Sequence, residues 1–354
     1  MPSALLAPVF ILYAAVGYYA LWVIGEQNSV APGAISLCTS GVVRSIYTRV
    51  PAVDKLVLLM LLLGYHECAH RWNLCHQLGL LVAFFHSASS LPQAAPFQTF
   101  FGSILAIPLL IILVESSKAN NPALIRWSAL AVGAVCQLVG AAVAVPTWMA
   151  LYSFLSIPHS VTGSSKALRS ITPAFTASFF GLALLMRNEG GYLSESQAQI
   201  GSAFWQAFPL WTSLLQIVIS SLLSDVGRTA GAEKRRTQTV FTFLTTAVWW
   251  KSLYTVHEIS GSTESTYLEV LWSIVNIPLH PKSHAQACHL FLLFDCAIFT
   301  LATLTFVIGG SKDKAGTAVR VAALTPVLGP GGALAWGWRS WDDVSVAAEK
   351  GKRS

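Results

Sequence analysis

Long apolar runs separated by short polar loops constrain the fold of this chain more than any other feature of its sequence. A helix that crosses a bilayer needs about 20 mostly apolar residues, so the runs predict an all-α, polytopic transmembrane helix bundle of about nine helices, within a range of about eight to ten. The expected helices are Ala4–Ile24, Ala52–Cys68, Phe97–Ser116, Leu124–Leu151, Thr172–Met186, Ser202–Leu223, Thr239–Val256, Ala287–Ile308 and Thr317–Trp336. A further stretch, Leu74–Phe85, is too short to span comfortably and is expected to be re-entrant or tilted.

Charged residues are scarce, which excludes a soluble domain. They make up 11% of the chain, against 54% hydrophobic residues, whereas a soluble domain carries about 25% charged residues. The net charge of +6 comes from Lys and Arg residues in loops and at the C-terminus. That distribution suits membrane orientation better than binding of nucleic acid. The six cysteines show neither zinc-finger spacing nor a disulfide framework.

The chain is expected to form one integral membrane domain over residues 1–354, with a short, disordered, basic tail at about 343–354. The first apolar run is expected to be a retained transmembrane helix, because it is longer than a signal-peptide core and has no basic segment before it. The basic segment Arg228–Arg236, together with Lys166 and Arg169, predicts that the loops flanking a hairpin of the fifth and sixth helices face the cytosol. Lys118 and Arg126 fit this orientation less well.

Four acidic residues lie within or near the ends of the apolar runs: Asp54, Glu67, Glu115 and Asp295. An ionisable group in a membrane helix is costly and indicates a functional site by default. A carboxylic acid kept neutral by desolvation could donate a proton to a substrate in an apolar cavity. Three alternatives stay open: Asp54 could cap a helix, Glu115 could reach the membrane surface, and Asp295 could form a helix–helix hydrogen bond.

Tryptophans are abundant, and three of them, Trp148, Trp205 and Trp211, are candidates for substrate binding. The electron-rich face of an indole can stabilise a carbocation. Tryptophan is also enriched where membrane helices meet water, so a position in an interfacial belt is the alternative for each.

One segment has the pattern of a zinc site. His66-Glu67-Cys68-Ala69-His70 matches H-E-x-x-H, which on a helix places both imidazoles on one face and the Glu beside a metal-bound water. His76 follows at the spacing of a third ligand. The alternative is a polar helix end at the membrane surface, so His66, His70 and His76 are metal ligands only in an alternative hypothesis.

Several short segments, in order, resemble a family of fungal membrane proteins that includes the membrane-bound terpene cyclases of ascochlorin and ascofuranone biosynthesis. They begin at residue 51 and end near residue 340. The segments are Pro51-Ala52-Val53-Asp54-Lys55-Leu56, Leu113-Val114-Glu115-Ser116, Gln137-Leu138-Val139-Gly140, Val145-Pro146-Thr147-Trp148, Trp205-Gln206-Ala207-Phe208-Pro209-Leu210-Trp211, Phe291-Leu292-Leu293-Phe294-Asp295 and Leu328-Gly329-Pro330-Gly331.

The resemblance implies a terpene cyclase that protonates a prenyl or epoxy-prenyl chain on an aromatic or polyketide head. An acid would start the cation cascade, and Asp295 and Glu115 are the first candidates, followed by Asp54 and Glu67. No metal, nucleotide or redox cofactor is expected. The expected partners are the prenylated substrate, membrane lipid, and neighbouring enzymes such as an epoxidase and a prenyltransferase. The expected location is the endoplasmic reticulum.

The sequence departs from that family in the segment Gly64–His70, where an apolar, Pro-rich stretch ending in an Asp-Gly turn is expected. The departure leaves the substrate open and raises the alternative that Glu67 takes a role normally held by a nearby Asp. Two other hypotheses therefore remain beside the cyclase: an intramembrane zinc enzyme that uses His66, Glu67 and His70, and a non-catalytic transporter or assembly partner.

Overall fold

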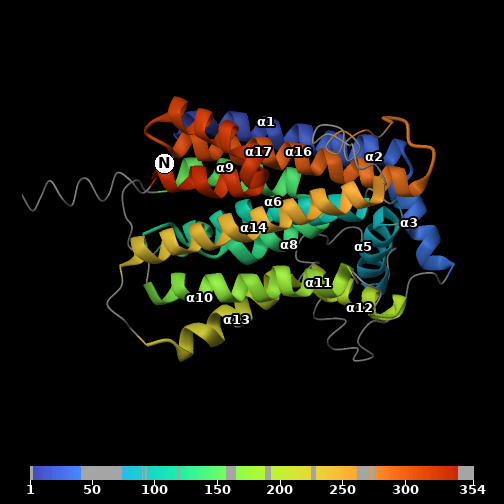
Figure 1. The fold of residues 1–354 in the computed structure, drawn as a ribbon, viewed down its shortest axis with the longest axis horizontal. Coiled ribbons are helices and arrows are strands. Elements are labelled where there is room, and N and C mark those ends of the chain that lie inside the picture. The colour runs from blue at the N-terminus through green and yellow to red at the C-terminus, as the bar shows by residue number, and fades with distance from the viewer. Residues whose placement is uncertain are drawn as a thin grey trace, which may run out of the picture.

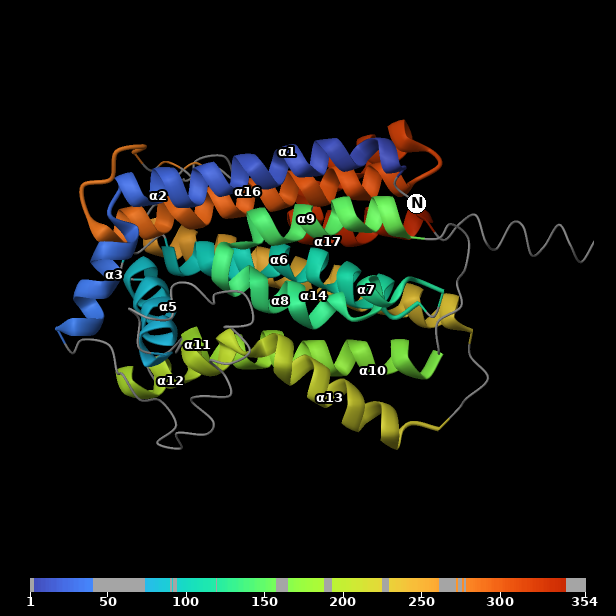
Figure 2. The ribbon, with the colours of Figure 1, turned by 180° about the vertical axis from the view of Figure 1, so that it is seen from behind.

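The computed structural model describes residues 3–40, 74–89, 91, 94–118, 120–156, 165–187, 193–224, 229–260, 272, 276 and 278–341. All regular secondary structure within these residues is helical, which confirms the all-α prediction. Most of the long helices run side by side along one axis (Figure 1; Figure 2). The α-helices are α1 (Ala7–Tyr18), α2 (Ile24–Gln27), α3 (Val30–Thr39), α5 (Leu74–Ser89), α6 (Ala94–Ser116), α7 (Ala123–Arg126), α8 (Ser128–Val139), α9 (Ala141–Leu155), α10 (Ser165–Phe175), α11 (Leu182–Arg187), α12 (Glu195–Gln206), α13 (Phe208–Leu222), α14 (Ala230–Ser260), α16 (His284–Gly310) and α17 (Lys314–Trp338). Two π-helical segments, η2 (Tyr19–Val23) and η3 (Thr176–Gly181), and two 3₁₀ turns, η1 (Ala4–Leu6) and η4 (Arg339–Trp341), complete them.

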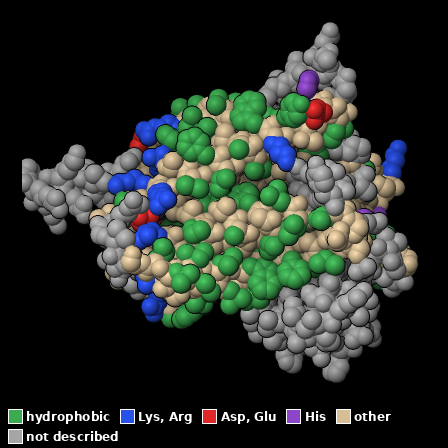
Figure 3. Space-filling view, turned by 60° about the horizontal axis from the view of Figure 1, so that its bottom comes forward, with side chains coloured by type: hydrophobic (Ala, Val, Ile, Leu, Met, Phe, Trp, Pro, Cys, Tyr) green, Lys and Arg blue, Asp and Glu red, His purple; other side chains and the backbone are tan. Residues whose placement is uncertain are grey.

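Among the described residues, five helical segments are long and apolar enough to cross a membrane. Many large apolar side chains on the outside of the bundle are exposed, as Figure 3 shows for one face. These features are compatible with an integral membrane protein, whereas the expected count of about nine spans is not confirmed. The five segments are Ala4–Gln27, Pro96–Ser116, Ser165–Met186, His284–Gly310 and Lys314–Trp341.

The expected single helix Leu124–Leu151 is wrong, because α8 and α9 form a hairpin. Gly140 separates them with φ 91° and ψ 152°, a conformation almost confined to glycine. The indole N–H of Trp148 donates to Oγ of Ser128 over 2.7 Å, although the two residues are 20 apart in the chain. On one straight helix they would lie about 30 Å apart, so α9 must fold back along α8.

The expected helix Thr317–Trp336 is wrong for the same reason. At Gly329, α17 leaves the helical conformation (φ 70°, ψ 165°), and the hydroxyl of Thr317 donates to Oγ of Ser340 over 3.3 Å. A straight helix would separate those residues by about 35 Å. Therefore α17 is also a helical hairpin, and its length does not correspond to one crossing of a bilayer.

Side chains of α14 hold the tip of the α17 hairpin. Pro330 has no amide hydrogen, and the turn at Gly329 frees the last carbonyls of the first half-helix. The hydroxyl of Thr246 donates to the Leu328 carbonyl over 2.9 Å, and the indole of Trp250 donates to the Val327 carbonyl over 2.8 Å. Partners on a neighbouring helix thus satisfy the backbone groups that the turn exposes.

Basic side chains gather at one end of the bundle, where α6, α9, α13 and α16 end and α10, α14 and α17 begin (Figure 3). Among the described Lys and Arg side chains, only Lys251 and Lys282 belong to other parts of the bundle. The guanidinium of Arg169, near the start of α10, donates to the Ser224 carbonyl just beyond α13. This contact places the start of α10 beside the end of α13, the arrangement on which the expected orientation depends.

Of the remaining expected helices, most fall within helical segments of the structure. They are Ala4–Ile24, Leu74–Phe85, Phe97–Ser116, Thr172–Met186, Thr239–Val256 and Ala287–Ile308. Ser202–Leu223 is wrong as one helix, because the chain turns at Ala207, just before the Phe208-Pro209 start of α13. Ala52–Cys68 and the basic tail lie outside the described residues.

Candidate active site

Asp295 lies inside α16 and is 4% exposed. Its Oδ1 accepts a hydrogen bond from the backbone N–H of Ala142 over 2.6 Å. The first amides of a helix have no partner within that helix, and Gly140 has no side chain with which to cap α9. Asp295 therefore caps α9 from a different helix, and among the described residues no cation is paired with it.

The end of α8, on the other side of Gly140, is also bonded by a side chain from another helix. The carbonyl of Val139, the last residue of α8, accepts a hydrogen bond from the indole of Trp22 over 3.1 Å. An added Cβ on Gly140 would approach Oδ1 of Asp295 to 3.2 Å. The tip of the α8–α9 hairpin is thus fitted closely against η2 and α16.

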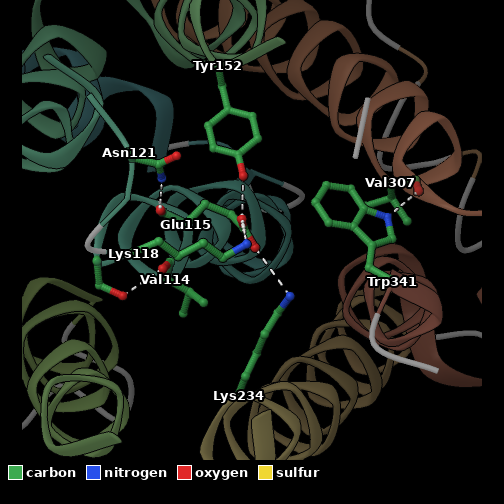
Figure 4. Close-up of polar contacts among 9 residues, drawn as sticks. Val114, Glu115, Lys118, Asn121, Tyr152, Lys234, Val307 and Trp341 are labelled. Atoms are coloured by element: carbon green, nitrogen blue, oxygen red, sulfur yellow. Dashed lines mark hydrogen bonds and ion pairs between the residues drawn. The ribbon is translucent and has the colours of Figure 1, made fainter. Parts of the chain in front are cut away.

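Glu115 lies at the C-terminal end of α6 and is 0% exposed, so its side chain is enclosed by the protein. Figure 4 shows that three side chains converge on its carboxylate. Oε2 accepts a hydrogen bond from the ammonium group of Lys118 and another, over 2.5 Å, from the Tyr152 hydroxyl. Oε1 accepts no hydrogen bond, but the ammonium group of Lys234 forms an ion pair with it at 3.3 Å. These contacts are those of an ionised carboxylate.

Aromatic rings contact two members of this cluster, Tyr152 and Lys234. Tyr152 stacks on Trp148, with ring centroids 4.8 Å apart, and Phe306 packs against both rings. The ammonium group of Lys234 lies 5.0 Å from the ring centroid of Trp338, within the range of a cation–π contact. Trp148 is therefore a buried part of the bundle (1% exposed) rather than a member of an interfacial belt.

The structure does not bring the two leading acid candidates together. Asp295 contacts α9 at Ala142, whereas Glu115 contacts it at Tyr152. The rise of 1.5 Å per residue separates these two positions on α9 by about 15 Å. The two carboxylates consequently serve separate sites at opposite ends of one helix.

Trp205 belongs to a second aromatic cluster. Its indole N–H donates to the Phe179 carbonyl, within the π-helical segment η3, over 3.1 Å. Its ring packs against those of Phe179, Phe208 and Phe85, with centroids 5.6–5.7 Å apart. Trp205 is 3% exposed, which excludes a lipid-facing belt. Trp211 is half-buried and stacks instead on Phe204, so the three candidate tryptophans occupy three different places.

The zinc hypothesis depends on residues that the structure mostly does not describe. His66, Glu67, His70 and Asp54 lie outside the described residues, and His76 lies in the first turn of α5, where only the backbone is described. Within the described part of the chain, no group of three His, Cys, Asp or Glu side chains could hold a metal ion.

Sequence reasoning missed the partners of Glu115. Lys234 lies before the apolar run that predicted its helix, and Tyr152 looks like one more aromatic residue of an apolar segment. A buried charge needs a partner, so the position of Glu115 at the end of an apolar run was a signal that a cation would lie nearby. Its identity depended on how α6, α9 and α14 meet.

The model of the CtvD domain matches residues 5–344, almost the whole chain. The chain belongs to the CtvD-domain family. It is also 24% identical to the terpene cyclase ascI of Acremonium egyptiacum, in an alignment that covers 78% of this chain and 80% of that protein. No solved structure matches the chain. The resemblance noted in the sequence is thereby confirmed, and the similarity supports a function of the terpene cyclase type.

Proposed function

We propose that this CtvD-domain protein is a membrane-embedded cyclase that closes the prenyl chain of a prenylated or epoxy-prenyl substrate by protonation. The observation that carries the proposal is the similarity to a terpene cyclase over most of both chains. The structure adds a buried carboxyl group within an apolar helix bundle rich in aromatic rings. Such an interior suits a cation that must be formed and moved out of contact with water.

Asp295 is the residue proposed to donate the proton. It is buried, and no ammonium or guanidinium group of the described residues holds it as an anion. The proton would pass to an epoxide oxygen or an alkene carbon. The epoxide C–O bond, or the alkene π bond, would break, and a π bond of the prenyl chain would attack the resulting cation. Loss of a proton to a base, or capture by a hydroxyl of the substrate followed by its deprotonation, would give a product isomeric with the substrate.

Glu115 is suited to a different role. Its carboxylate is paired with two ammonium groups, so it is poorly placed to carry the proton that starts the reaction. We propose that it positions the Tyr152 hydroxyl, and with it the Trp148 ring stacked on Tyr152. Asp54 and Glu67 remain proposals as further acids.

Two substitutions of Asp295, to asparagine and to alanine, separate catalysis from helix capping. An asparagine side chain would still offer an oxygen to the Ala142 N–H, because asparagine is a good helix cap, but it has no acidic proton. Asp295→Asn is expected to fold and to lose cyclisation, while Asp295→Ala is expected to lose the cap as well. The assay is conversion of an epoxidised farnesyl-aryl substrate by yeast microsomes to a cyclic isomer of unchanged mass.

Cyclisation by the Asp295→Asn variant would refute the role of Asp295 as the acid and leave it only the role of a helix cap. A zinc chelator added to the wild-type assay tests the alternative enzyme, because cyclisation by acid is expected to survive it. Failure of the wild-type protein to convert any of a panel of prenylated substrates would overturn the cyclase proposal. We further propose residence in the endoplasmic reticulum, next to the enzymes that prenylate and epoxidise the substrate.

A further inference from the structure

Two glutamine side chains in the bundle interior, Gln206 and Gln238, have no hydrogen-bond partner among the described residues for either amide atom. Both residues are 0% exposed. Buried amides are almost always paired, because the loss of water without a replacement partner is unfavourable. Two fully unpaired amides therefore indicate polar groups that the fold itself does not use.

Two hydroxyl groups are also buried with no hydrogen-bond partner among the described residues. They are Oγ of Ser202 and Oγ1 of Thr176. Ser202 lies one turn before Gln206, so the two side chains occupy one face of α12. These four unpaired side chains come from three elements, η3, α12 and α14.

The same elements, with α10 and α13, carry the rings of the second aromatic cluster. Phe179 of η3 packs against Phe208 of α13 with ring centroids 4.9 Å apart, and against Trp205 of α12 at 5.6 Å. Phe175 of α10 packs against Phe241 of α14 at 5.6 Å. Gln206 directly follows Trp205, and Gln238 lies one turn before Phe241. The unpaired polar groups are therefore carried on the helices that build one aromatic cluster.

The chemistry of these groups points to an uncharged ligand. None of the four unpaired side chains is ionisable, and the cluster consists of hydrocarbon rings and one indole. Lys234, one turn from Gln238 on α14, is already paired with Glu115. An anion such as diphosphate needs cations when buried, whereas an amide, which both donates and accepts, suits a hydroxyl or carbonyl oxygen.

We propose that Gln206 and Gln238 bind the oxygen-bearing head of a neutral, lipid-soluble substrate, such as a phenol, whose apolar part lies against the second aromatic cluster. This inference rests on the proposed function, since the head would belong to the molecule whose prenyl chain is closed. Ser202 and Thr176 are further hydrogen-bonding groups for the same head.

The test measures binding without catalysis, on the full-length protein purified in detergent. The probe is a radiolabelled resorcinol with a fully saturated farnesyl chain, which cannot cyclise, and the comparison ligand is the same chain on an unsubstituted benzene ring. Gln206→Leu and Gln238→Leu are each expected to raise the Kd of the resorcinol by about tenfold and to leave that of the benzene unchanged. Neither variant is expected to lower the unfolding temperature, because the amide it removes has no partner in the part of the chain that the structure describes.

Gln98→Leu is the matched control. Gln98 is buried, but its amide donates to the Phe85 carbonyl over 3.2 Å. Gln98→Leu is therefore expected to lower the unfolding temperature and to leave the ratio of the two Kd values, resorcinol to benzene, unchanged. An unchanged Kd for the resorcinol in both variants, or an equal loss for both ligands, would overturn the inference. If the Gln variants raise the Kd of the resorcinol but the wild-type protein does not cyclise the unsaturated substrate, only the proposed function is refuted. Cyclisation with unaltered KM in both variants would refute only this inference.

Discussion

The ion pair between Glu115 and Lys234 allows a quantitative test of the polar cluster at the end of α6. Lys118 is 17% exposed and can turn toward solvent, whereas the side chain of Lys234 is 5% exposed and cannot. Glu115→Gln should therefore leave a buried ammonium group without its carboxylate. Breaking a buried pair from one side costs about 3–5 kcal/mol.

Lys234→Met keeps much of the side-chain volume and leaves Glu115 with Lys118 and Tyr152, so the expected loss of stability is smaller, about 1–3 kcal/mol. In the double variant neither charge is stranded. Its loss should fall short of the sum of the single losses by about 1–3 kcal/mol, the usual coupling for residues in contact. The measurement is the free energy of unfolding of all four proteins in detergent micelles.

Additive losses, within about 0.5 kcal/mol, would refute this reasoning. They would mean that Lys234 finds other partners as good as Glu115. Phe243→Ala is a control on the same helix, since Phe243 is 71% exposed and its removal should not couple to Glu115.

Two further predictions concern the hairpins and the orientation. Gly140→Ala and Gly329→Ala should each lower the free energy of unfolding by at least about 1–3 kcal/mol, because both glycines occupy conformations that alanine avoids; unchanged urea or SDS denaturation curves would contradict the hairpin turns. The basic end of the bundle should face the cytosol. In sealed microsomes, the thiol of Lys314→Cys should then react with an impermeant maleimide added outside, and that of Leu279→Cys only after the membrane is opened. The reverse pattern would invert the orientation.

Apolar length predicted where many helices lie but not where the chain turns back. Leu124–Leu151 would measure about 42 Å as one helix, well beyond the hydrocarbon core of about 30 Å. This excess length, together with Gly140 near its middle, was the available signal for a hairpin. The same error explains why Lys118 and Arg126 seemed misplaced, since a hairpin returns the chain to the end at which it started.

The candidate sites were predicted as residues but not as contacts. Asp295 and Glu115 were identifiable because each is an acid in an apolar context. Their partners are a backbone amide freed by the turn at Gly140 and a lysine from a helix more than 100 residues away in the chain. Both depend on tertiary packing, which no local pattern specifies. The unpaired amides of Gln206 and Gln238 could likewise be found only after their neighbours were known.

The two hairpins have a consequence for how the protein is made. In a membrane, a helical pair that enters and leaves on the same side moves no hydrophilic loop across the lipid, so its insertion needs no translocation step. The side chains that bond each tip lie outside the hairpin itself: Asp295 on α16 and Trp22 on η2 for the first, and Thr246 and Trp250 on α14 for the second. For the first hairpin, Trp22 is synthesised before Gly140 and Asp295 after it. For the second, Thr246 and Trp250 are both synthesised before Gly329. The α8–α9 hairpin must therefore wait for α16 to be synthesised before its backbone is fully bonded, whereas α17 finds its partners already in place.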